Sequence, residues 1–321
     1  MNKNNIIYTI LFFLLFGTIF FYTVLLSWKI DCDHLSETIT IERGDTVSSV
    51  SRILENNLCL NSIIFKIAMK ITFNDKNLKY GRYDLKSVEN VRDLINMLTS
   101  VSSERTRVTI IEGLRLQEIA LIFADRMNLD IEKFISLCYD RKFIKSLNLD
   151  SDVTSLEGYL FPDTYIFLNT YTESDVIKIL VKQFIYNFNE YVRNNTKLSK
   201  NDIVILASII QGEAYYSDEM RKISSVYHNR LKKNMLLQAD PTIQFALPKH
   251  KKRILYTDTQ IESKYNTYLY KGLPPGPINS PGIDALRSAA NPETTKFLYF
   301  VSDKKGRHIF NVNYKDHLRS K

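Results

Sequence analysis

The most constraining feature of the sequence is an uncharged, apolar segment near its start. Residues 6–28 read IIYTILFFLLFGTIFFYTVLLSW and contain no charged side chain. About 20 apolar residues are enough for a helix to cross the hydrocarbon core of a membrane. A cleaved signal peptide is the alternative, but it usually has a shorter apolar stretch and a small-residue cleavage pattern, which residues 25–29 lack. The segment therefore predicts an uncleaved transmembrane anchor within residues 1–30.

The rest of the chain contains no second apolar span, which predicts a single-pass protein of the cell (inner) membrane. Lys3 precedes the segment, and Lys29, Asp31 and Asp33 follow it. This charge distribution favours a cytoplasmic N-terminus only weakly. We expect residues 30–321 to lie outside the cytoplasm.

The charge balance does not indicate nucleic-acid binding. The chain has 43 basic and 35 acidic residues, for a net charge of +8. The basic residues are spread along the sequence, without an arginine-rich helix or an RNP-like aromatic motif. The densest basic run, residues 249–253, follows Pro248 and is interpreted as a solvated loop. We expect no nucleic-acid partner, although a basic domain is compatible with anionic lipid or an acidic wall polymer.

Several cofactor and metal classes lack their sequence signatures. No glycines match G-x-G-x-x-G or the P-loop pattern, and the five histidines do not form H-E-x-x-H. No G-x-S-x-G motif indicates a serine hydrolase. The three cysteines, Cys32, Cys59 and Cys138, have no C-x-x-C spacing, so one disulfide is possible and a bridge between Cys59 and Cys138 stays open. We expect no cofactor and no metal.

The region after the apolar segment predicts a small mixed module. Residues 38–42 alternate like a strand, and Asp45 is a candidate cap for a helix that starts near Val47. A second helix over 62–69, a strand over 80–85 and a helix over 91–98 follow. The strand–helix–helix–strand order over residues 37–100 resembles a LysM-like module, but a plain structural βααβ domain explains it equally well. A strand at 107–113 and a helix at 116–127 come next.

One predicted helix places a carboxyl group on a buried stripe. Ser199 and Asp202 form a variant of the capping box, and residues 203–210 are apolar on nearly every side. At 100° per residue, Glu213 falls within an arc of about 80° that it shares with Ile203 and Ile210. Removal from water favours the neutral form of a carboxyl, as a general acid requires. The alternative is a Glu at a frayed helix end that reaches solvent or pairs with Arg221 or Lys222.

Two later segments suggest a binding wall. Residues 237–242 (LQADPT) predict a polar turn set by proline, and residues 265–268 (YNTY) precede a loop at 272–282 that holds four of the eight prolines. Such a loop is stiff at little entropic cost. Aromatic, amide and hydroxyl groups together suit the faces and hydroxyls of sugars. The alternative is an elaborate surface turn.

Seven segments occur in one order along the chain: TIIEG (109–113), LEGYLFPDTY (156–165), ASIIQGEA (207–214), LQADPT (237–242), YNTY (265–268), GLPPGPI (272–278) and YFVSD (299–303), with His308 and Phe310 after them. In this order they resemble the motifs of the endolytic murein transglycosylases (YceG-like proteins), over roughly residues 37–317. The resemblance implies a membrane anchor, a LysM-like subdomain and a lytic transglycosylase domain. Its implied reaction cuts the MurNAc–GlcNAc bond of nascent glycan strands without water and leaves 1,6-anhydro ends, which would terminate glycan elongation.

The resemblance also assigns residues. The family motif S-I-[IV]-x-x-E places the catalytic glutamate on Glu213, while Gln211 stands where many relatives have a second glutamate. Asp240 and Asp163 are candidates for a second, positioning carboxylate. The implied substrate-binding residues are Gln238, Asp240, Thr242, Tyr265, Asn266, Thr267, Tyr268 and Asn279. Peptidoglycan strands are the implied substrate, and membrane-bound peptidoglycan synthases are the implied partners.

The sequence thus predicts an α+β protein with three parts. These are an anchor (1–30), a LysM-like subdomain (37–100) and a larger mixed α/β catalytic domain (105–320) built around a buried catalytic helix. The alternative function is a non-catalytic, membrane-anchored peptidoglycan-binding scaffold for wall synthesis.

Overall fold

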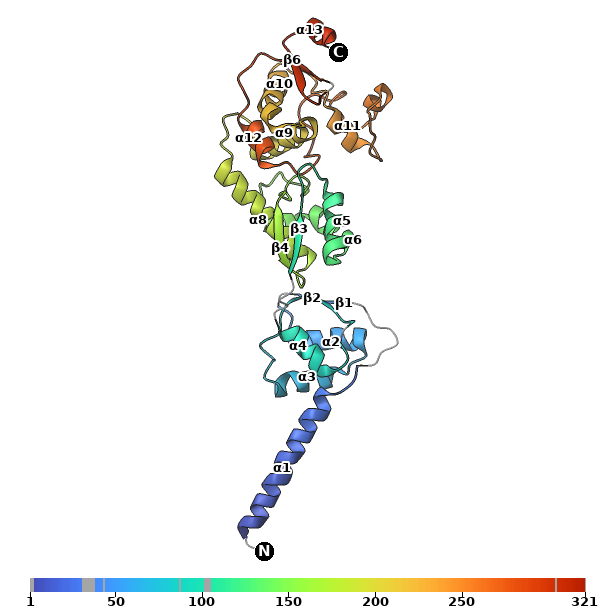
Figure 1. Ribbon diagram of the computed structural model, residues 1–321, viewed down its shortest axis with the longest axis vertical. Helices are drawn as coiled ribbons and strands as arrows, with labels where there is room; N and C mark the ends of the chain where they lie inside the picture. The colour runs from blue at the N-terminus through green and yellow to red at the C-terminus, as the bar shows by residue number, and fades with distance from the viewer. Residues whose placement is uncertain are drawn as a thin grey trace. The chain divides into compact units, whose positions relative to one another are not determined.

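The computed structural model describes residues 3–30, 38–42, 44–86, 88–100, 105–303 and 305–320. Asp31 and Asp33, which entered the topology prediction, and Cys32 lie outside these residues. Within them the chain has a mixed α+β composition of many helices and three two-stranded sheets (Figure 1). It divides into two compact units, one formed by residues 1–106 with 167–172 and the other by 107–166 with 173–321. The three predicted domain ranges stay a prediction.

The first unit follows the predicted βααβ order. Its elements are α1 (Lys3–Leu26), β1 (Thr38–Ile41), α2 (Val47–Leu58), α3 (Ser62–Ile71), β2 (Gly81–Asp84) and α4 (Val91–Thr99). β1 and β2 pair antiparallel, with Thr38 opposite Asp84 and Ile41 opposite Gly81. The helices begin where a polar side chain accepts a backbone N–H: Thr46 caps α2 and Asn90 caps α4. The predicted cap Asp45 is thus one residue early, and it accepts a hydrogen bond from the Ser49 hydroxyl instead.

A single apolar core holds this unit together. Buried residues recur at helical spacing, as Val50, Leu54 and Leu58 do in α2, and face Ile39 and Ile41 of β1. Two residues of α1, Leu25 and Leu26, also belong to this core, being 7% and 4% exposed. The end of α1 is therefore part of the folded unit.

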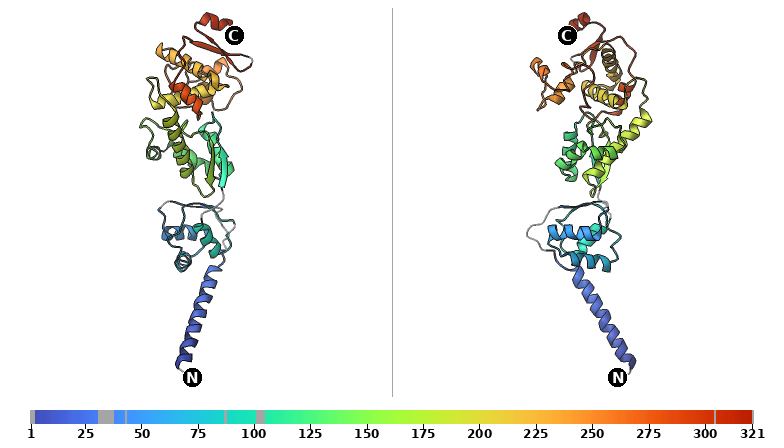
Figure 2. Two further views of the ribbon diagram at one scale, coloured as in Figure 1. Left: turned by 60° about the vertical axis from the view of Figure 1, so that its left-hand side comes forward. Right: turned by 180° about the vertical axis from the view of Figure 1, so that it is seen from behind.

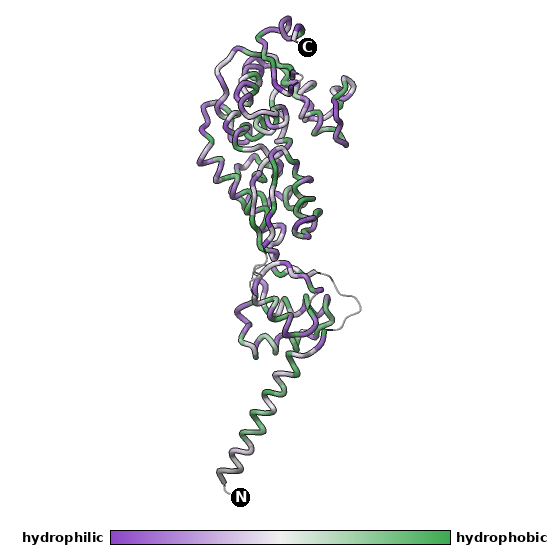
Figure 3. Tube along the Cα trace, in the orientation of Figure 1, coloured by the Kyte–Doolittle hydropathy of each residue, from purple (hydrophilic) through white to green (hydrophobic). Residues whose placement is uncertain are grey.

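The apolar segment near the start of the chain is helical in the structure. Figure 3 shows its largely hydrophobic colouring along α1. Among the described residues, however, no helix is both long enough and apolar enough to cross a membrane. Leu25 and Leu26, at the end of α1, are buried in the core of the first unit, whereas Val24 and Trp28 are exposed.

The second unit is built around one buried helix. Its elements are α5 (Leu116–Met127), α6 (Ile131–Tyr139), α7 (Arg141–Ser146), α8 (Glu173–Tyr191), α9 (Lys200–Glu213), η1 (Ser217–Glu219), α10 (Met220–Lys232), α11 (Asp240–Ala246), η2 (Tyr256–Gln260), α12 (Ile283–Ala290), β5 (Tyr299–Ser302), β6 (His308–Asn311) and α13 (Tyr314–Arg319). β3 (Arg105–Thr109) pairs with β4 (Thr164–Leu168), and the two strands lie side by side in the views of Figure 2.

α9 is the central helix of this unit. Every residue from Ile203 to Ile210 is buried, because α12, α10 and α11 all pack against it. Its start is the predicted capping box, in which the Ser199 side chain accepts from the Asp202 N–H and the Asp202 side chain accepts from the Ser199 N–H. The cap fixes where the helix begins, and the helix ends before Ala214, whose N–H donates to the carbonyl of Ile210. The last residue of α9 is Glu213.

Cys138 of α6 is a free, buried thiol. A disulfide between Cys59 and Cys138 is therefore not formed.

Candidate active site

Glu213 lies half-buried at the C-terminal end of α9, where two other helices approach its carboxyl group. Tyr227 of α10 donates a hydrogen bond from its hydroxyl to Glu213 Oε1 at 2.8 Å. The backbone N–H of Asp240, at the start of α11, donates to the same carboxyl. Arg221, one of the two basic partners considered for Glu213, donates to the carbonyl of Asn291.

The environment of Glu213 raises its pKa to about 7. Burial is the main cause, since it disfavours the charged form, and the nearby charge of Asp240 acts in the same direction. The hydrogen bond from Tyr227 and the positive charge of Arg230 lower the pKa but do not offset the burial. A carboxyl that is close to half protonated at neutral pH can donate a proton and also take one back.

Arg230 links three segments of the chain near Glu213. It is a buried residue of α10, one helical turn beyond Tyr227. Its guanidinium donates to the carbonyls of Leu298 at 2.7 Å and Leu237 at 2.6 Å. It thus ties α10 to the segment before α11 and to the segment before β5, which keeps a positive charge near Glu213.

The second carboxylate in the site, Asp240, has a partner of its own. Its Oδ1 accepts a hydrogen bond from the Tyr268 hydroxyl at 2.5 Å. This bond joins the LQADPT and YNTY segments, which the sequence analysis singled out separately. The sequence predicts a turn over the LQADPT segment, but the second half of the segment is helical. The α11 helix begins at Asp240, with Pro241 in its first turn.

Gly212 allows α9 and α11 to approach each other closely. A Cβ atom at this position would lie 2.7 Å from Cβ of Pro241 and 3.6 Å from Nδ2 of Asn279. The first distance is too short for two carbon atoms that are not bonded. Only glycine therefore fits between Glu213 and the start of α11.

The proline-rich loop at 272–282 is fixed to α9 through Ser208. The Ser208 hydroxyl accepts from the N–H of Ile278 at 3.0 Å, and its carbonyl accepts from Asn279 Nδ2 at 2.8 Å. Asn279 is 6% exposed, and no described residue hydrogen-bonds to its Oδ1. This leaves an acceptor beside Glu213 that a ligand N–H or O–H could satisfy.

Gln211 has a structural explanation. Its Oε1 accepts from the N–H of Gly282 at 3.0 Å, and its side chain also hydrogen-bonds to the carboxylate of Glu112. An amide can accept from one group and donate to the other, whereas a glutamate could not donate to Glu112 when ionised. Gln211 thus links the TIIEG segment to the proline-rich loop.

An open cleft of about 930 Å³ passes over Glu213. It lies entirely within the second unit, and its wall is made from segments far apart in sequence. Its lining residues are Glu112, Gly113, Leu114, Arg115, Glu118, Gly212, Glu213, Asp240, Pro241, Gln244, His250, Lys251, Lys252, Arg253, Ile254, Ile278, Asn279 and Val301. The volume lies within the range of small-molecule and sugar sites.

Only some of the predicted site residues line this cleft. Glu213, Asp240 and Asn279 do. Thr242 and Thr267 are buried, and their hydroxyls lie 2.9 Å apart in a network that also binds the N–H of Ala239. Asn266 is buried too, and its amide donates to backbone carbonyls at 259 and 261. These three side chains shape the segments that carry Asp240 and Tyr268.

The remaining predicted residues lie further out. Gln238 is exposed and has a left-handed backbone with φ of 49°. Tyr265 packs against Phe245, with ring centroids 4.7 Å apart. Asp163 is exposed and accepts from Thr164 N–H and Gln183 Nε2. Asp163 is not among the residues that line the cleft, and its role as a second carboxylate stays a prediction.

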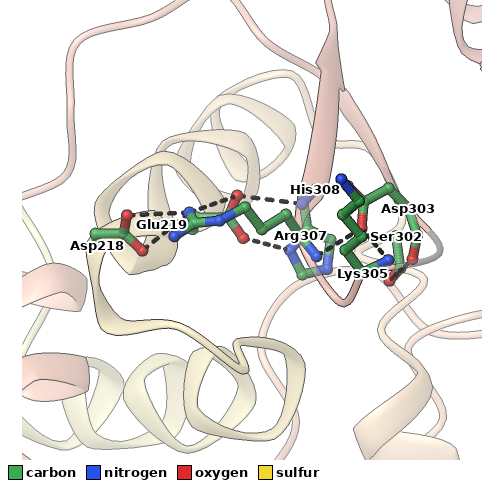
Figure 4. A network of polar contacts seen from close by, with 7 residues as sticks. All are labelled: Asp218, Glu219, Ser302, Asp303, Lys305, Arg307 and His308. Atoms are coloured by element: carbon green, nitrogen blue, oxygen red, sulfur yellow. Dashed lines mark hydrogen bonds and ion pairs between the residues drawn. The ribbon is translucent and has the colours of Figure 1, made fainter.

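A hairpin closes the site behind Tyr227. Phe300 of β5 packs edge-on against the Tyr227 ring at 5.9 Å, and the next residue, Val301, lines the cleft. The hairpin is held by Glu219, which accepts from the His308 N–H and lies 3.1 Å from His308 Nδ1 (Figure 4). Arg307 lies 3.0 Å from Asp218 and 3.7 Å from Glu219. We call Asp218, Glu219, Arg307 and His308 the hairpin latch.

Sequence reasoning missed Tyr227, Arg230 and the latch residues other than His308. Tyr227 and Arg230 stand on the buried face of an ordinary amphipathic helix, where an aromatic residue predicts core packing. The signal that could have found them is the pairing of a buried Tyr with a buried Arg one turn later. A raised pKa alone does not identify a site residue. Burial also raises the pKa of Glu157 to about 7, but Glu157 accepts from Leu116 N–H at the start of α5 and does not line the cleft.

The described residues contain no group of three or more His, Cys, Asp or Glu side chains placed to hold a metal ion. A carboxyl group with a raised pKa, set in the wall of an open cleft and held by a tyrosine and a backbone amide, is a site suited to general acid–base catalysis.

Known proteins share this arrangement of sequence and fold. The model of the YceG-like family matches residues 39–321. The endolytic murein transglycosylase of Bacillus subtilis is 34% identical over 96% of this chain and 90% of its own length. That of Streptococcus pneumoniae is 30% identical over 88% of this chain, which spans 57% of the pneumococcal protein. A YceG-like protein of Listeria monocytogenes superposes with a TM-score of 0.62 at 32% identity, covering 88% of this chain and 98% of that one. The chain belongs to the YceG-like family.

Proposed function

We propose that this protein is an endolytic murein transglycosylase that acts outside the cytoplasm, where peptidoglycan lies. The observation that carries the proposal is the half-buried carboxyl of Glu213 in the cleft wall, with a pKa raised to about 7. The names of the Bacillus and pneumococcal relatives support the same reaction class. The substrate would be a glycan strand cut at the bond between MurNAc and GlcNAc, with a 1,6-anhydro end as the product.

A single carboxyl can carry both proton transfers of this reaction. Protonated Glu213 would donate to the oxygen that leaves with the GlcNAc side. The resulting carboxylate would then take the proton from the 6-hydroxyl of MurNAc as that hydroxyl attacks the anomeric carbon. No water enters, unlike in ordinary glycosidases, which use a pair of carboxylates.

The surroundings of Glu213 suit this double role. The nearest other carboxylate, Asp240, already accepts from Tyr268, which favours a positioning role for it over proton transfer. The Tyr227 hydroxyl stabilises the charged form of Glu213 after the first transfer. The free Oδ1 of Asn279 would accept from an amide or hydroxyl of the sugar. The buried threonines and Asn266 would act by shaping these segments.

The βααβ part of the first unit would hold the strand without reacting. Its order, β1–α2–α3–β2, is that of a LysM-like module, and we propose that it binds glycan in this way. The enzymes that polymerise glycan strands would supply the substrate, so they are the partner class that this function implies.

The test compares Glu213→Gln with the wild-type protein on purified glycan strands. Gln keeps the size and hydrogen bonding of Glu but cannot transfer a proton, a step worth about 10²–10⁴-fold in rate. We expect the release of anhydro-ended fragments to fall by at least this factor, while circular dichroism shows an unchanged fold. Glu262→Gln, the same substitution at an exposed residue outside the cleft, should cut at the wild-type rate.

The non-catalytic scaffold is the alternative that this experiment separates. If the wild-type protein binds strands but releases no anhydro ends, the scaffold function is correct. If Glu213→Gln cuts as fast as the wild type, Glu213 is not the catalytic acid.

A further inference from the structure

One stretch of the cleft wall is strongly basic. His250, Lys251, Lys252 and Arg253 follow one another in the loop between α11 and η2, and all four line the cleft that holds Glu213. The loop was interpreted from sequence as an ordinary solvated turn. Its position gives it a substrate-facing surface instead.

This loop is anchored to the fold. Gln244 of α11 donates to the carbonyl of Lys251 at 2.6 Å and accepts from its N–H at 3.3 Å. The Lys251 ammonium pairs with Asp258 at 2.6 Å. These bonds hold Lys251, in the middle of the basic run, in the cleft wall. The backbone positions of its neighbours His250 and Lys252 are thereby fixed as well.

The basic side chains differ in what they bind within the protein. Lys251 is neutralised by Asp258, and Arg115 donates to the carbonyl of Gln244 while it stacks on Phe245. In the part of the chain that the structure describes, no carboxylate forms an ion pair with Lys252 or Arg253. Both are exposed, so their charges are available to a ligand.

The acidic residues of the cleft come from other segments. Glu112 belongs to the TIIEG segment, and Glu118 follows it in α5. Glu213 ends α9, and Asp240 begins α11. A ligand that fits the whole cleft should therefore bring neutral, hydrogen-bonding groups to the acidic side and anionic groups to the basic loop. The sugar hydroxyls and acetamido groups of a glycan strand offer only the former, and the attached peptides add carboxylates.

We propose that Lys252 and Arg253 form an anion subsite for the carboxylates of the peptides attached to murein glycan. This proposal rests on the proposed function, since the subsite would bind a part of the same substrate that lies away from the bond that is cut. Its consequence is a preference for strands whose peptides carry free carboxylates over strands whose peptide carboxylates have been amidated. The phosphates of an anionic wall polymer share this charge and are the other source that the test must separate.

The test measures kcat/KM on two preparations of one set of peptide-bearing glycan strands, one with the peptide carboxylates free and one with them amidated. The wild-type protein should prefer the strands with free carboxylates. Two exposed ion pairs of ordinary strength together account for about a three- to tenfold preference at low salt. The preference should shrink in 1 M salt, where the Debye length is about 3 Å.

The decisive variant is Lys252→Gln/Arg253→Gln, for which the ratio of the two kcat/KM values should fall to about one. The matched control is Lys249→Gln/Lys264→Gln, which removes the same charge from exposed residues that do not line the cleft and should keep the wild-type ratio. If the double variant keeps its preference, or if the control loses it, the subsite is wrong. A wild-type protein that cuts neither preparation overturns the proposed function itself.

A competition experiment separates the two anions. Free stem peptide should inhibit the wild type more than the same peptide with its carboxylates amidated. Inhibition by a glycerol-phosphate polymer that exceeds that by the peptide at equal charge would overturn the carboxylate assignment in favour of phosphate.

Discussion

The hydroxyl of Tyr227 donates a hydrogen bond to Oε1 of Glu213 across 2.8 Å, from the middle of α10 to the end of α9. Since burial raises the pKa of the Tyr227 hydroxyl well above its ordinary value, the hydroxyl stays protonated and remains a donor. The bond favours the charged form of Glu213 and opposes the effect of burial. The acid strength of Glu213 therefore depends on a residue that faces the protein core.

Tyr227→Phe should shift the pH dependence of the reaction. Removal of the hydroxyl leaves burial unopposed by this bond, so the pKa of Glu213 should rise above its present value of about 7. Protonated Glu213 is the reactive form in the free enzyme, so kcat/KM falls at high pH as the proton is lost. We expect this basic limb to move to higher pH in the variant. A limb that stays in place, measured by release of anhydro ends across pH 5–9, would contradict the role of Tyr227.

Glu213→Gln should stabilise the protein above neutral pH while it abolishes activity. The pKa of Glu213 is about 7 in the folded chain, against an ordinary value of 4.5. The folded state thus holds the proton more tightly, and the free energy of unfolding falls as pH rises from about 4.5 to about 7. The variant lacks this loss. Its free energy of unfolding should therefore exceed that of the wild type by about 1–3 kcal/mol above pH 7 and equal it near pH 4. Denaturant unfolding at the two pH values checks the difference.

Gly212→Ala should disturb the site without removing any reacting group. The added Cβ would lie 2.7 Å from Pro241 Cβ, so α9 and α11 must move apart. A displacement of about 1 Å between Glu213 and Asp240 can cost about 10²-fold in rate. Gly276→Ala is the control, because its Cβ would lie 3.1 Å from the Tyr265 hydroxyl, which can move aside. We expect kcat to fall strongly in the first variant and little in the second.

Glu219→Gln should loosen the hairpin that backs Tyr227. Glu219 is 7% exposed, and both of its oxygens are used by His308. An amide can replace only one oxygen acceptor, so the free energy of unfolding should fall by about 1–2 kcal/mol. Asp218→Asn alters only the exposed partner of Arg307 and should change stability much less. Equal losses in the two variants, measured by thermal unfolding, would contradict this ranking.

The local elements of the fold were largely predictable. The helix over residues 116–127 begins and ends where the sequence predicts, and the capping box at Ser199 forms as expected. These features depend on neighbours within one helical turn, so the sequence alone contains their causes. The βααβ order of the first unit could be predicted because each of its elements has a local sequence pattern of its own.

The composition of the cleft was harder to predict. Glu213 could be singled out because its helix is apolar on nearly every side. Its partners Tyr227 and Asp240 are set by how three helices pack, and that packing depends on contacts such as Gly212 against Pro241. Sequence patterns contain no direct signal for such contacts. The position of Asp163 outside the cleft lining was not predictable, because a polar motif shows that a residue is not in the core but not which surface it faces.

Two backbone hydrogen bonds join Gly113 N–H to the carbonyl of Ser280 at 2.8 Å and Ser280 N–H to the carbonyl of Leu114 at 2.8 Å. The cleft wall therefore closes only when the early TIIEG segment meets a loop from the last quarter of the chain. A chain still being synthesised already contains Glu213 before that loop exists. Until residues 272–301 are made, Glu213 has neither the opposite wall nor the hairpin behind Tyr227. The order of synthesis thus delays the activity until the proline-rich loop and the β5–β6 hairpin have been made.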